Sequence, residues 1–350
     1  MTERENFIRA YCFEEPDWIP GGVGVRADGW HKYGEALNDL YEKYFGYRPY
    51  TADKIPHPDP QFIKNDEYHR TWTDEWGCTM EERIFGIHPM IVGHPLADWA
   101  ALRTYQPPAG PDTSPETVER ERKQIAESKK TNFVIHHFLR LFERMQWLRG
   151  YAQLMLDFAE DPPELHRMAD LIVEHNLKFI RHSIDVGADG IGFSDDWGTQ
   201  NALMIHPRRW REFFAPRYRC MFQPALDAGL MIHFHSDGYI MDIIPDLREL
   251  GVSVLNLQTN CHDLAALGRL GREIRLCLST DMDRQGSLSF GTPEDVKDYT
   301  RRVVQTVGGP DGGLVLSYEC GSDTPLENIE AAMQAYQEWR DYPRRKRTGN

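Results

Sequence analysis

Short apolar runs alternate with helical patterns through the second half of the chain. The runs are nearly continuous in hydrophobicity, which is typical of parallel strands that are covered on both faces. Each run is followed by residues whose apolar positions recur with helical spacing. The runs span residues 190–194, 230–235, 252–257, 274–279 and 314–318. This repeated strand-then-helix unit predicts a parallel α/β fold.

Start signals precede several of the expected helices. Asp161, Thr292 and Thr324 each stand before proline, with a carboxylate close behind, the pattern of an N-cap followed by proline in the first turn. After the first of them, an apolar stripe continues to Gly187, a natural C-cap. The spacing of these signals supports the strand-then-helix interpretation.

The first half of the chain is less regular. Residues 18–25 and 132–137 predict strands, residues 139–159 predict a helix, and residues 70–91 alternate as a hairpin does. Residues 26–131 hold many prolines and aromatic residues. We expect them to be insertions that cap or wall the mouth of the fold.

Parallel strands joined by helices leave two main architectures, a closed eight-stranded barrel or an open doubly wound sheet. The open sheet usually begins with a glycine-rich phosphate-binding turn, and no early turn of that form is evident. We therefore expect a single (β/α)₈ TIM-barrel domain over residues 1–350. Its active site should lie at the C-terminal ends of the strands.

The charge and the cysteines narrow the class of protein. A formal net charge of -14 leaves no basic surface for nucleic acid. No apolar run has the length of a membrane span or a signal peptide, so we expect a cytoplasmic enzyme with small-molecule partners. The 6 cysteines are scattered, which favours thiols, ligands or nucleophiles over disulfides. Nothing in the sequence fixes the oligomeric state.

The strand around residue 233 carries the most informative chemistry. Because side chains alternate along a strand, His233, His235 and Asp237 should point to one side and Phe234 and Ser236 to the other. A lone histidine at a strand end would more often bond a neighbouring carbonyl. Three ionisable side chains in one register favour metal binding or acid–base chemistry instead.

The last strand offers further ligands. It ends in Glu319 and Cys320, and the strand ends of a closed barrel converge, so both can approach His235 and Asp237. Nitrogen, oxygen and sulfur donors with one open position describe a catalytic zinc site. Taken alone, Cys320 would be interpreted as a buried thiol.

A third feature is the loop that follows residues 190–194. Asp195 and Asp196 are adjacent there, so we expect one to face the mouth and the other to cap a helix or pair with an arginine. Trp197 would then sit where a substrate binds. The polar side chains expected to complete the rim are Asn256, Gln258, Asp281 and Asp283.

These segments resemble the uroporphyrinogen decarboxylase superfamily, and within it the cobalamin-dependent methyltransferases. The matching stretches are residues 189–198, 206–214, 235–238, 244–247 and 324–328. The resemblance implies a (β/α)₈ barrel and, in the methyltransferase branch, a zinc ion held by a His-x-Cys motif and a later cysteine.

The ligand pattern of that branch is only partly matched. His235 falls on its histidine, Asp237 stands where its first cysteine would be, and Cys320 lies near its later cysteine. His233 matches nothing in the pattern, and it remains a further candidate ligand together with Glu319. The decarboxylase's arginine-rich Arg-Gln-Ala-Gly-Arg segment is absent, and the region reads Gly-Val-Gly-Val-Arg at residues 22–26. A macrocycle bearing several carboxylates therefore has no evident partner.

The resemblance leads to a specific hypothesis. A carboxylate in place of a thiolate leaves zinc more electron-poor, so we expect it to polarise an ether oxygen of a methyl donor. Cobalamin on a separate corrinoid protein would take the methyl group, with Asp195 or His206 as the acid and Asp196 beside it. Aryl methyl ethers are the expected donors because tryptophans could wall a flat pocket. The candidates are Trp30, Trp72, Trp76 and Trp197.

Other functions stay open at this point. The same system includes transfer from methylcobalamin to tetrahydrofolate, and the superfamily includes decarboxylases. A barrel that binds a corrinoid or tetrapyrrole without catalysis is a third alternative. A metal-dependent hydrolase is a fourth, because His-x-His also occurs there, but on the first barrel strand rather than two-thirds of the way along.

Overall fold

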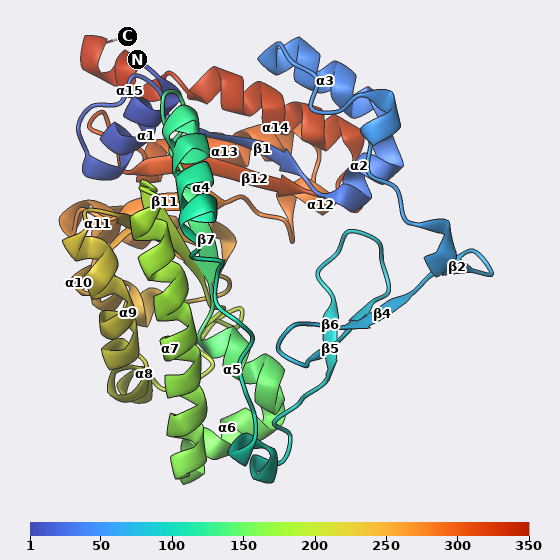
Figure 1. Cartoon of the computed structure of the whole chain (residues 1–350). Coiled ribbons are helices and arrows are strands. Elements are labelled where there is room, and N and C mark those ends of the chain that lie inside the picture. The colour runs from blue at the N-terminus through green and yellow to red at the C-terminus, as the bar shows by residue number, and fades with distance from the viewer. Residues whose placement is uncertain (350) are drawn as a thin grey trace.

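The computed structural model describes residues 1–349 and contains a curled sheet of 7 parallel strands (Figure 1). The strand order is β1-β12-β11-β10-β9-β8-β7, so the sheet follows the chain backwards from its last strand, with β1 on the outer side of β12. The predicted barrel architecture is confirmed, with 7 strands rather than eight in the parallel sheet of the described chain. The strands are β1 (Gly21–Val25), β7 (Ile135–Leu139), β8 (Gly190–Ser194), β9 (Met231–Ser236), β10 (Val252–Gln258), β11 (Cys277–Asp281) and β12 (Leu314–Cys320).

Helices pack against the outer face of this sheet (Figure 1). Residues that point outward are fully buried between sheet and helices, as Ile232 and Phe234 of β9 are. No helix within residues 1–349 combines the length and the apolar character needed to cross a bilayer. The helices that follow strands or precede the sheet are α1 (Glu3–Cys12), α7 (Pro163–Asp185), α8 (Pro207–Phe213), α9 (Ala215–Asp227), α10 (Ile244–Glu249), α11 (Leu264–Glu273), α12 (Ser287–Phe290), α13 (Pro293–Val307), α14 (Leu326–Trp339) and α15 (Tyr342–Thr348).

Two predicted elements have different bounds for a backbone reason. The strand expected over residues 274–279 begins only at Cys277, because Arg275 has a φ of 50° and cannot be extended. The helix expected over residues 139–159 is divided at Gly150, whose φ of 86° ends one helix and begins the next. The two parts are α5 (Phe142–Arg149) and α6 (Tyr151–Glu160).

The predicted helix starts have mixed outcomes. Thr292 caps α13, and its hydroxyl and Asp295 form a reciprocal capping box as predicted. Asp161 was wrong as an N-cap, because it adopts a left-handed conformation that ends α6. Thr324 was wrong as well, since its hydroxyl accepts a bond from the Gly321 amide and the residue before α14 is Pro325.

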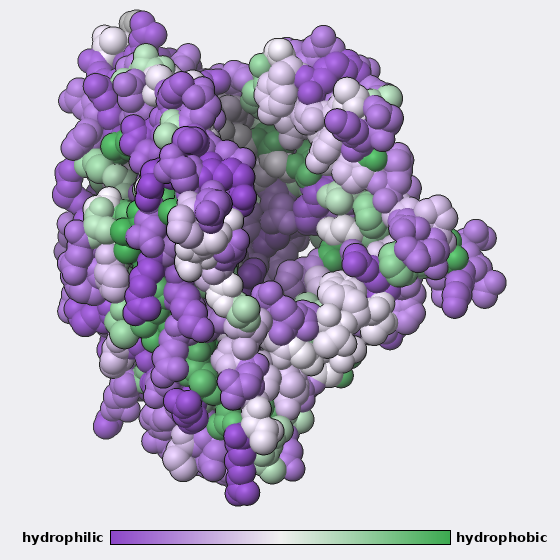
Figure 2. Space-filling view, viewed as in Figure 1, coloured by the Kyte–Doolittle hydropathy of each residue, from purple (hydrophilic) through white to green (hydrophobic). Residues whose placement is uncertain are grey.

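Residues 26–131 form the elements between β1 and β7. The hairpin predicted over residues 70–91 is confirmed, because β4 and β5 pair antiparallel and β6 joins them. This small sheet projects on the side toward which β1 and β12 point (Figure 1), and Figure 2 shows a hydrophilic hollow beside it. The elements are α2 (Ala27–Tyr33), α3 (Glu35–Phe45), β2 (Ile63–Lys64), β3 (Glu67–Tyr68), β4 (Arg70–Thr73), β5 (Thr79–Glu82), β6 (Met90–Gly93) and α4 (Pro115–Ser128).

Asp195 ties three elements together at the end of β8. Its carboxylate is 0% exposed and accepts hydrogen bonds from the backbone amides of Leu141 (3.0 Å) and Glu143 (2.8 Å), at the start of α5. It also accepts a bond of 2.5 Å from the Tyr218 hydroxyl on α9. A helix N-terminus favours a negative charge, so this carboxylate holds α5 over the strand end.

We expect Asp195→Ala to lower the free energy of unfolding by about 3 kcal/mol, because it leaves buried amide and hydroxyl donors without an acceptor. Urea unfolding of the purified variants measures this change. Asp227→Ala is the matched control, since that aspartate is exposed at the end of α9, and it should change stability by less than about 0.5 kcal/mol. If D195A changed the free energy of unfolding no more than the control does, Asp195 would not be what holds α5 over the strand end.

Candidate functional site

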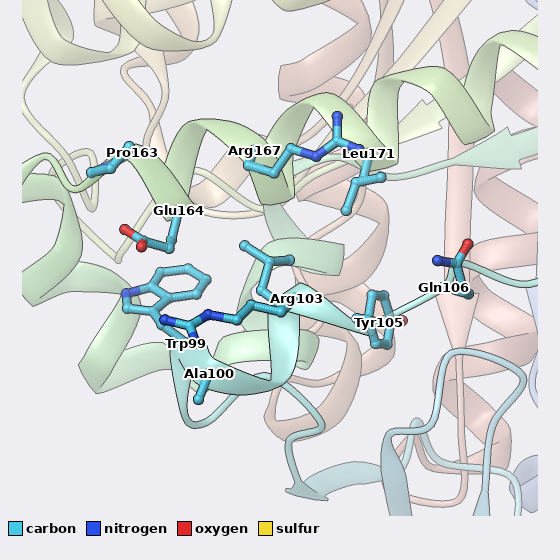
Figure 3. A pocket seen from close by; sticks show the side chains of 10 residues that line it. Trp99, Ala100, Arg103, Tyr105, Gln106, Pro163, Glu164, Arg167 and Leu171 are labelled. Atoms are coloured by element: carbon cyan, nitrogen blue, oxygen red, sulfur yellow. The ribbon is translucent and has the colours of Figure 1, made fainter.

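A surface pocket of about 520 Å³ lies beside α7, away from the strand ends (Figure 3). Trp99, Arg103 and Tyr105 face Glu164 and Arg167 across it. None of the residues predicted to carry chemistry lines this pocket. Those residues gather instead at the C-terminal ends of the parallel strands.

The side chains of β9 alternate as the sequence predicts. His233 and His235 are half-buried and face the barrel interior, whereas Phe234 and Ser236 are buried against the helices. The Ser236 hydroxyl accepts a hydrogen bond of 3.0 Å from the Trp197 amide, which joins the ends of β8 and β9. This register brings the imidazole of His235 to the barrel mouth.

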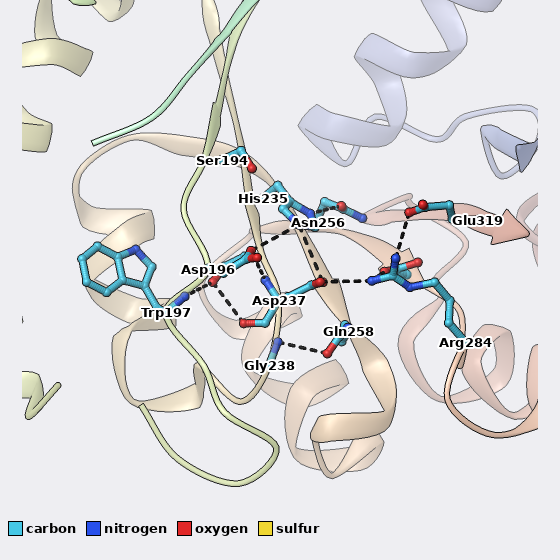
Figure 4. Close-up of polar contacts among 12 residues, drawn as sticks. Ser194, Asp196, Trp197, His235, Asp237, Gly238, Asn256, Gln258, Arg284 and Glu319 are labelled. Carbon is cyan, nitrogen blue, oxygen red and sulfur yellow. Dashed lines mark hydrogen bonds and ion pairs between the residues drawn. The ribbon is translucent and has the colours of Figure 1, made fainter. Parts of the chain in front are cut away.

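His235 meets two carboxylates at the mouth (Figure 4). Its Nε2 lies 3.5 Å from Oδ1 of Asp196 and 3.6 Å from Oδ1 of Asp237. One candidate ligand atom from each of the three residues lies within 4.8 Å of the other two. The Asp237 amide also donates a bond of 2.9 Å to Asp196, which fixes the two carboxylates relative to each other.

The spacing of these three residues fits a divalent metal ion. Two ligands that each lie about 2.1 Å from a tetrahedral ion are about 3.4 Å apart. On the other side of the ring, Nδ1 of His235 lies 2.5 Å from Oδ1 of Asn256, whose amide nitrogen donates to the Ser279 carbonyl at 3.0 Å. That second bond orients the amide, so Nδ1 carries the proton and Nε2 is left for the cluster.

The pKa values of the three residues in this cluster depend on one another. Burial alone would lower the pKa of His235, but Asp196 and Asp237 raise it to about 9. Burial alone would raise the pKa of Asp196, but His235 holds it below its ordinary value. Burial raises the pKa of Asp237. Without a metal ion, His235 is therefore protonated at neutral pH, and a bound cation must displace this proton.

Arg284 is a central residue that the sequence reasoning missed. Its guanidinium pairs with Asp237 after β9 (3.0 Å) and Glu319 on β12 (3.0 Å), as Figure 4 shows, and also with Asp281 at the end of β11 (2.9 Å). Burial raises the pKa of Asp281 to about 7. The sequence did hold a signal for it. Arg284 comes three residues after Asp281, just past the end of a strand, and Asp281 was already predicted to belong to the acidic rim.

Glu143 is a second missed residue. It lies in the first turn of α5, where Arg140 Nε is 3.1 Å from its carboxylate and the Ser194 hydroxyl is 3.5 Å away. Burial, and then the charges of Asp196 and Asp195, raise the pKa of Glu143 to about 8. No pattern along the chain connects residue 143 to the strand end, because the contact depends on how α5 packs over β8.

The structure does not bring the predicted sulfur ligand, Cys320, to the cluster around His235. On β12, Ser317 and Glu319 face the barrel, so Tyr318 and Cys320 point to the helices, where the Tyr318 hydroxyl bonds Thr300 at 2.8 Å. Cys320 is 0% exposed and does not belong to the cluster around His235. Burial raises the pKa of its thiol to about 12, as expected for a packed cysteine. Glu319, the alternative candidate, is the side chain at the mouth.

Three other predicted residues do not reach the mouth. Trp197 is 0% exposed and stacks on Phe142, with 4.0 Å between ring centroids. His206 is exposed and caps α8 by accepting a bond of 3.2 Å from the Arg208 amide. The Asp195 carboxylate already accepts hydrogen bonds from the Leu141 and Glu143 amides and from the Tyr218 hydroxyl. These contacts are structural, and the catalytic and substrate-binding roles expected for the three residues stay predictions.

Several remaining candidates also have structural contacts. The Gln258 side chain accepts a bond of 3.1 Å from the Gly238 amide, and Trp30 and Trp76 are buried in the core. His233 faces the barrel interior below the cluster, with its ring edge-on to Phe138 at 5.9 Å. Burial lowers the pKa of His233 to about 4, so it is neutral. Trp72 is half-buried on β4.

The fold and the cluster define a parallel α/β-barrel protein with a histidine and carboxylate site at the C-terminal ends of its strands. The family model of Uroporphyrinogen decarboxylase (URO-D) matches residues 95–339, which is more than half of the chain. The chain therefore belongs to the URO-D family, as the resemblance in its sequence indicates.

Curated relatives are distant and only partly covered. A uroporphyrinogen decarboxylase of Synechococcus sp. (strain CC9605) is 26% identical over 194 residues, which is 53% of this chain and 51% of that protein. Uroporphyrinogen decarboxylase 2, chloroplastic, of Arabidopsis thaliana is 23% identical over 266 residues, which is 73% and 65%. The chain thus spans about half the length of the first of these relatives and somewhat less than two thirds of the second.

A solved structure matches nearly the whole chain. It is described as a methyltransferase from Methanosarcina mazei, with a TM-score of 0.61, 17% sequence identity, and coverage of 97% of this chain and 99% of that one. At this identity the likeness shows the shared fold.

The raised pKa of His235 predicts a pH dependence of stability. A histidine with a pKa of about 9 in the folded protein and about 6.5 in the unfolded chain stabilises the fold fully below about pH 6.5, and this contribution is lost as the pH rises through about 9. We expect the stability advantage of the chelator-treated parent over His235→Gln to shrink between about pH 7 and about pH 9.5. Urea unfolding at both pH values measures it.

His206→Gln is the control for that measurement, because His206 is exposed and lies outside the cluster. Its difference from the parent should not change with pH over the same range. A constant difference between the parent and H235Q would contradict the charge coupling of His235 to Asp196 and Asp237.

Proposed function

We propose that the protein is a zinc-dependent methyltransferase that moves a methyl group between a small O-methyl compound, most suitably an aryl methyl ether, and the cobalamin of a corrinoid protein. The observation that carries the proposal is the donor set at the mouth, one imidazole and two carboxylates from His235, Asp196 and Asp237. The thiol of Cys320 points away from it. Such ligands leave zinc electron-poor, which favours polarising an oxygen over activating a thiol.

The pairing of the arginines at the mouth supports a substrate with little negative charge. Arg26 pairs with Asp28 (3.2 Å), Glu319 (3.4 Å) and Asp323 (3.2 Å). Arg284 is held by three carboxylates in the same way. A substrate with several carboxylates would have to displace these pairs, whereas a methyl ether would not.

The residues of the chain have separate tasks in this scheme. When bound, zinc would supply Lewis acidity at the ether oxygen, and cobalamin would accept the methyl group. His235 presents Nε2 to the site while Asn256 holds its other nitrogen. Glu143 holds a proton beside Asp196 at neutral pH and can give it to the substrate oxygen that loses the methyl group. We assign Glu143 this acid role, which the sequence had suggested for Asp195 or His206.

A second candidate is decarboxylation of a tetrapyrrole, because the curated relatives named above are uroporphyrinogen decarboxylases. The same purified protein can be tested with uroporphyrinogen. Turnover of that compound with no methyl transfer from any ether would favour this candidate.

We expect His235→Ala to lose the zinc bound at the mouth and to lower methyl transfer by about 100-fold or more. Zinc content is measured after chelator treatment and reconstitution. Transfer is measured as consumption of cob(I)alamin in the presence of methoxy-substituted aromatic acids, with free cobalamin at high concentration replacing the corrinoid protein.

Cys320→Ser is the matched control, since the thiol lies outside the cluster, and it should keep the zinc content and activity of the parent. Unchanged zinc binding in H235A, or loss of zinc in C320S alone, would contradict the proposal that His235, Asp196 and Asp237 hold the ion.

Glu143→Gln tests the acid. With a pKa of about 8, Glu143 should lose its proton as the pH rises, so activity of the parent should fall above about pH 8. In E143Q we expect kcat to fall by about 100-fold and this alkaline decline to disappear, with zinc content unchanged. A full alkaline decline in the variant would assign the proton to another group.

A further inference from the structure

A second group of histidines lies on the outer side of β7. Adjacent residues of a strand normally point to opposite faces. His137 has a left-handed φ of 60°, however, and the pairing of β7 with β8 shifts register between Ile135 and Phe138. As a result, the rings of His136 and His137 lie together, with 4.0 Å between their centroids. A β-bulge thus places two imidazoles side by side.

Two helices complete the group. His182 of α7 has its ring centroid 5.4 Å from that of His136 and 5.8 Å from that of His137. One candidate ligand atom from each of the three histidines lies within 4.8 Å of the other two. Glu121 of α4 lies beside them, with its Oε2 3.0 Å from Nε2 of His182. The group therefore joins a strand and two helices.

Several polar atoms of this group lack hydrogen-bond partners within residues 1–349. Nε2 of His137 and Nδ1 of His182 are buried without a partner, whereas Nε2 of His182 and Oε2 of Glu121 are paired with each other at 3.0 Å but form no hydrogen bond. The His182 side chain is only 3% exposed. Nδ1 of His136 lies 3.0 Å from the Ser183 hydroxyl, which leaves its Nε2 free of that bond. An unpaired buried polar group is unfavourable, so several in one place indicate a missing common partner.

Two of the imidazoles, those of His136 and His137, are in the neutral form that binds metals. Burial, and then the neighbouring imidazoles, lower the pKa of His136 and bring that of His137 to about 4. Neutral rings offer a free lone pair. A carboxylate next to a ligating histidine is a common way to orient its ring.

We propose that His136, His137 and His182 bind a divalent transition-metal ion such as zinc, with Glu121 as its carboxylate partner, at a site separate from the barrel mouth. Imidazole ligands suit zinc, whereas magnesium prefers oxygen. β7 is an edge strand of the parallel sheet, so an ion here clamps that edge to α7 and α4. Phe138, the next residue, already faces the interior at His233, so β7 separates the two sites.

The inference does not depend on methyl transfer, and the test uses H235A protein, in which the mouth cannot supply its histidine ligand. After chelator treatment, this protein should bind one equivalent of zinc, and zinc but not magnesium should raise its Tm. Cobalt(II) should give the visible absorption of a site with nitrogen ligands. Absence of both the zinc-dependent Tm shift and the cobalt spectrum would overturn the proposal.

Two variants in the H235A background locate the ion. His137→Asn keeps a residue that tolerates a left-handed φ but removes the imidazole, and His182→Gln removes the ligand on α7. Each should bind zinc about 100-fold more weakly and lose the zinc-dependent Tm shift. His166→Gln, on the exposed part of α7, is the control and should retain both. Equal zinc affinity in all three would place the ion elsewhere and overturn the site.

If one variant fails to fold, the other variant and the cobalt spectrum of H235A still decide the question. The outcome is also independent of the activity assay. A protein with the β7 ion but no methyl transfer, or with methyl transfer but no β7 ion, would separate the two proposals.

Discussion

On each strand of the curled parallel sheet, neighbouring side chains must point to opposite faces, one toward the barrel interior and the next toward the helices. At the end of β8 this geometry sends Asp196 to the mouth and Asp195 to the start of α5. At the end of β12 it sends Glu319 to the mouth and Cys320 to the helix layer. Residues that are adjacent in the sequence therefore have different functions, one chemical and one structural.

The mouth that results holds more carboxylates than cations. Asp196 and Asp237 share the single imidazole of His235, and Arg284 serves three acidic side chains at once. The two carboxylates keep the proton on His235 despite its burial, and burial followed by the charges of Asp196 and Asp195 gives Glu143 a proton as well. The excess of carboxylates also explains why a bound cation suits the site, because the cation would provide the positive charge that the proton on His235 now supplies.

The alternation fails at one described place on the sheet edge, and chemistry gathers there too. A left-handed φ in a residue other than glycine costs conformational energy, and His137 adopts one. Its effect is to turn two imidazoles toward the buried ring of His182. A metal ion bound here would offset the cost of this conformation. It would also hold β7 in place, an edge strand that pairs only with β8. The two faces of β7 thus belong to different sites.

The sequence by itself determined the parallel α/β architecture, most strands, the capping box at Thr292 and the register of His233, His235 and Asp237, because each depends on the local period of the chain. It could also tell that only one of Asp195 and Asp196 faces the mouth. Which one does so, which side of β12 carries Cys320, and the contacts of Arg284 and Glu143 were decided only by the tertiary structure. They depend on how strands are set beside one another and how α5 packs over β8, and no local pattern encodes a contact between distant segments.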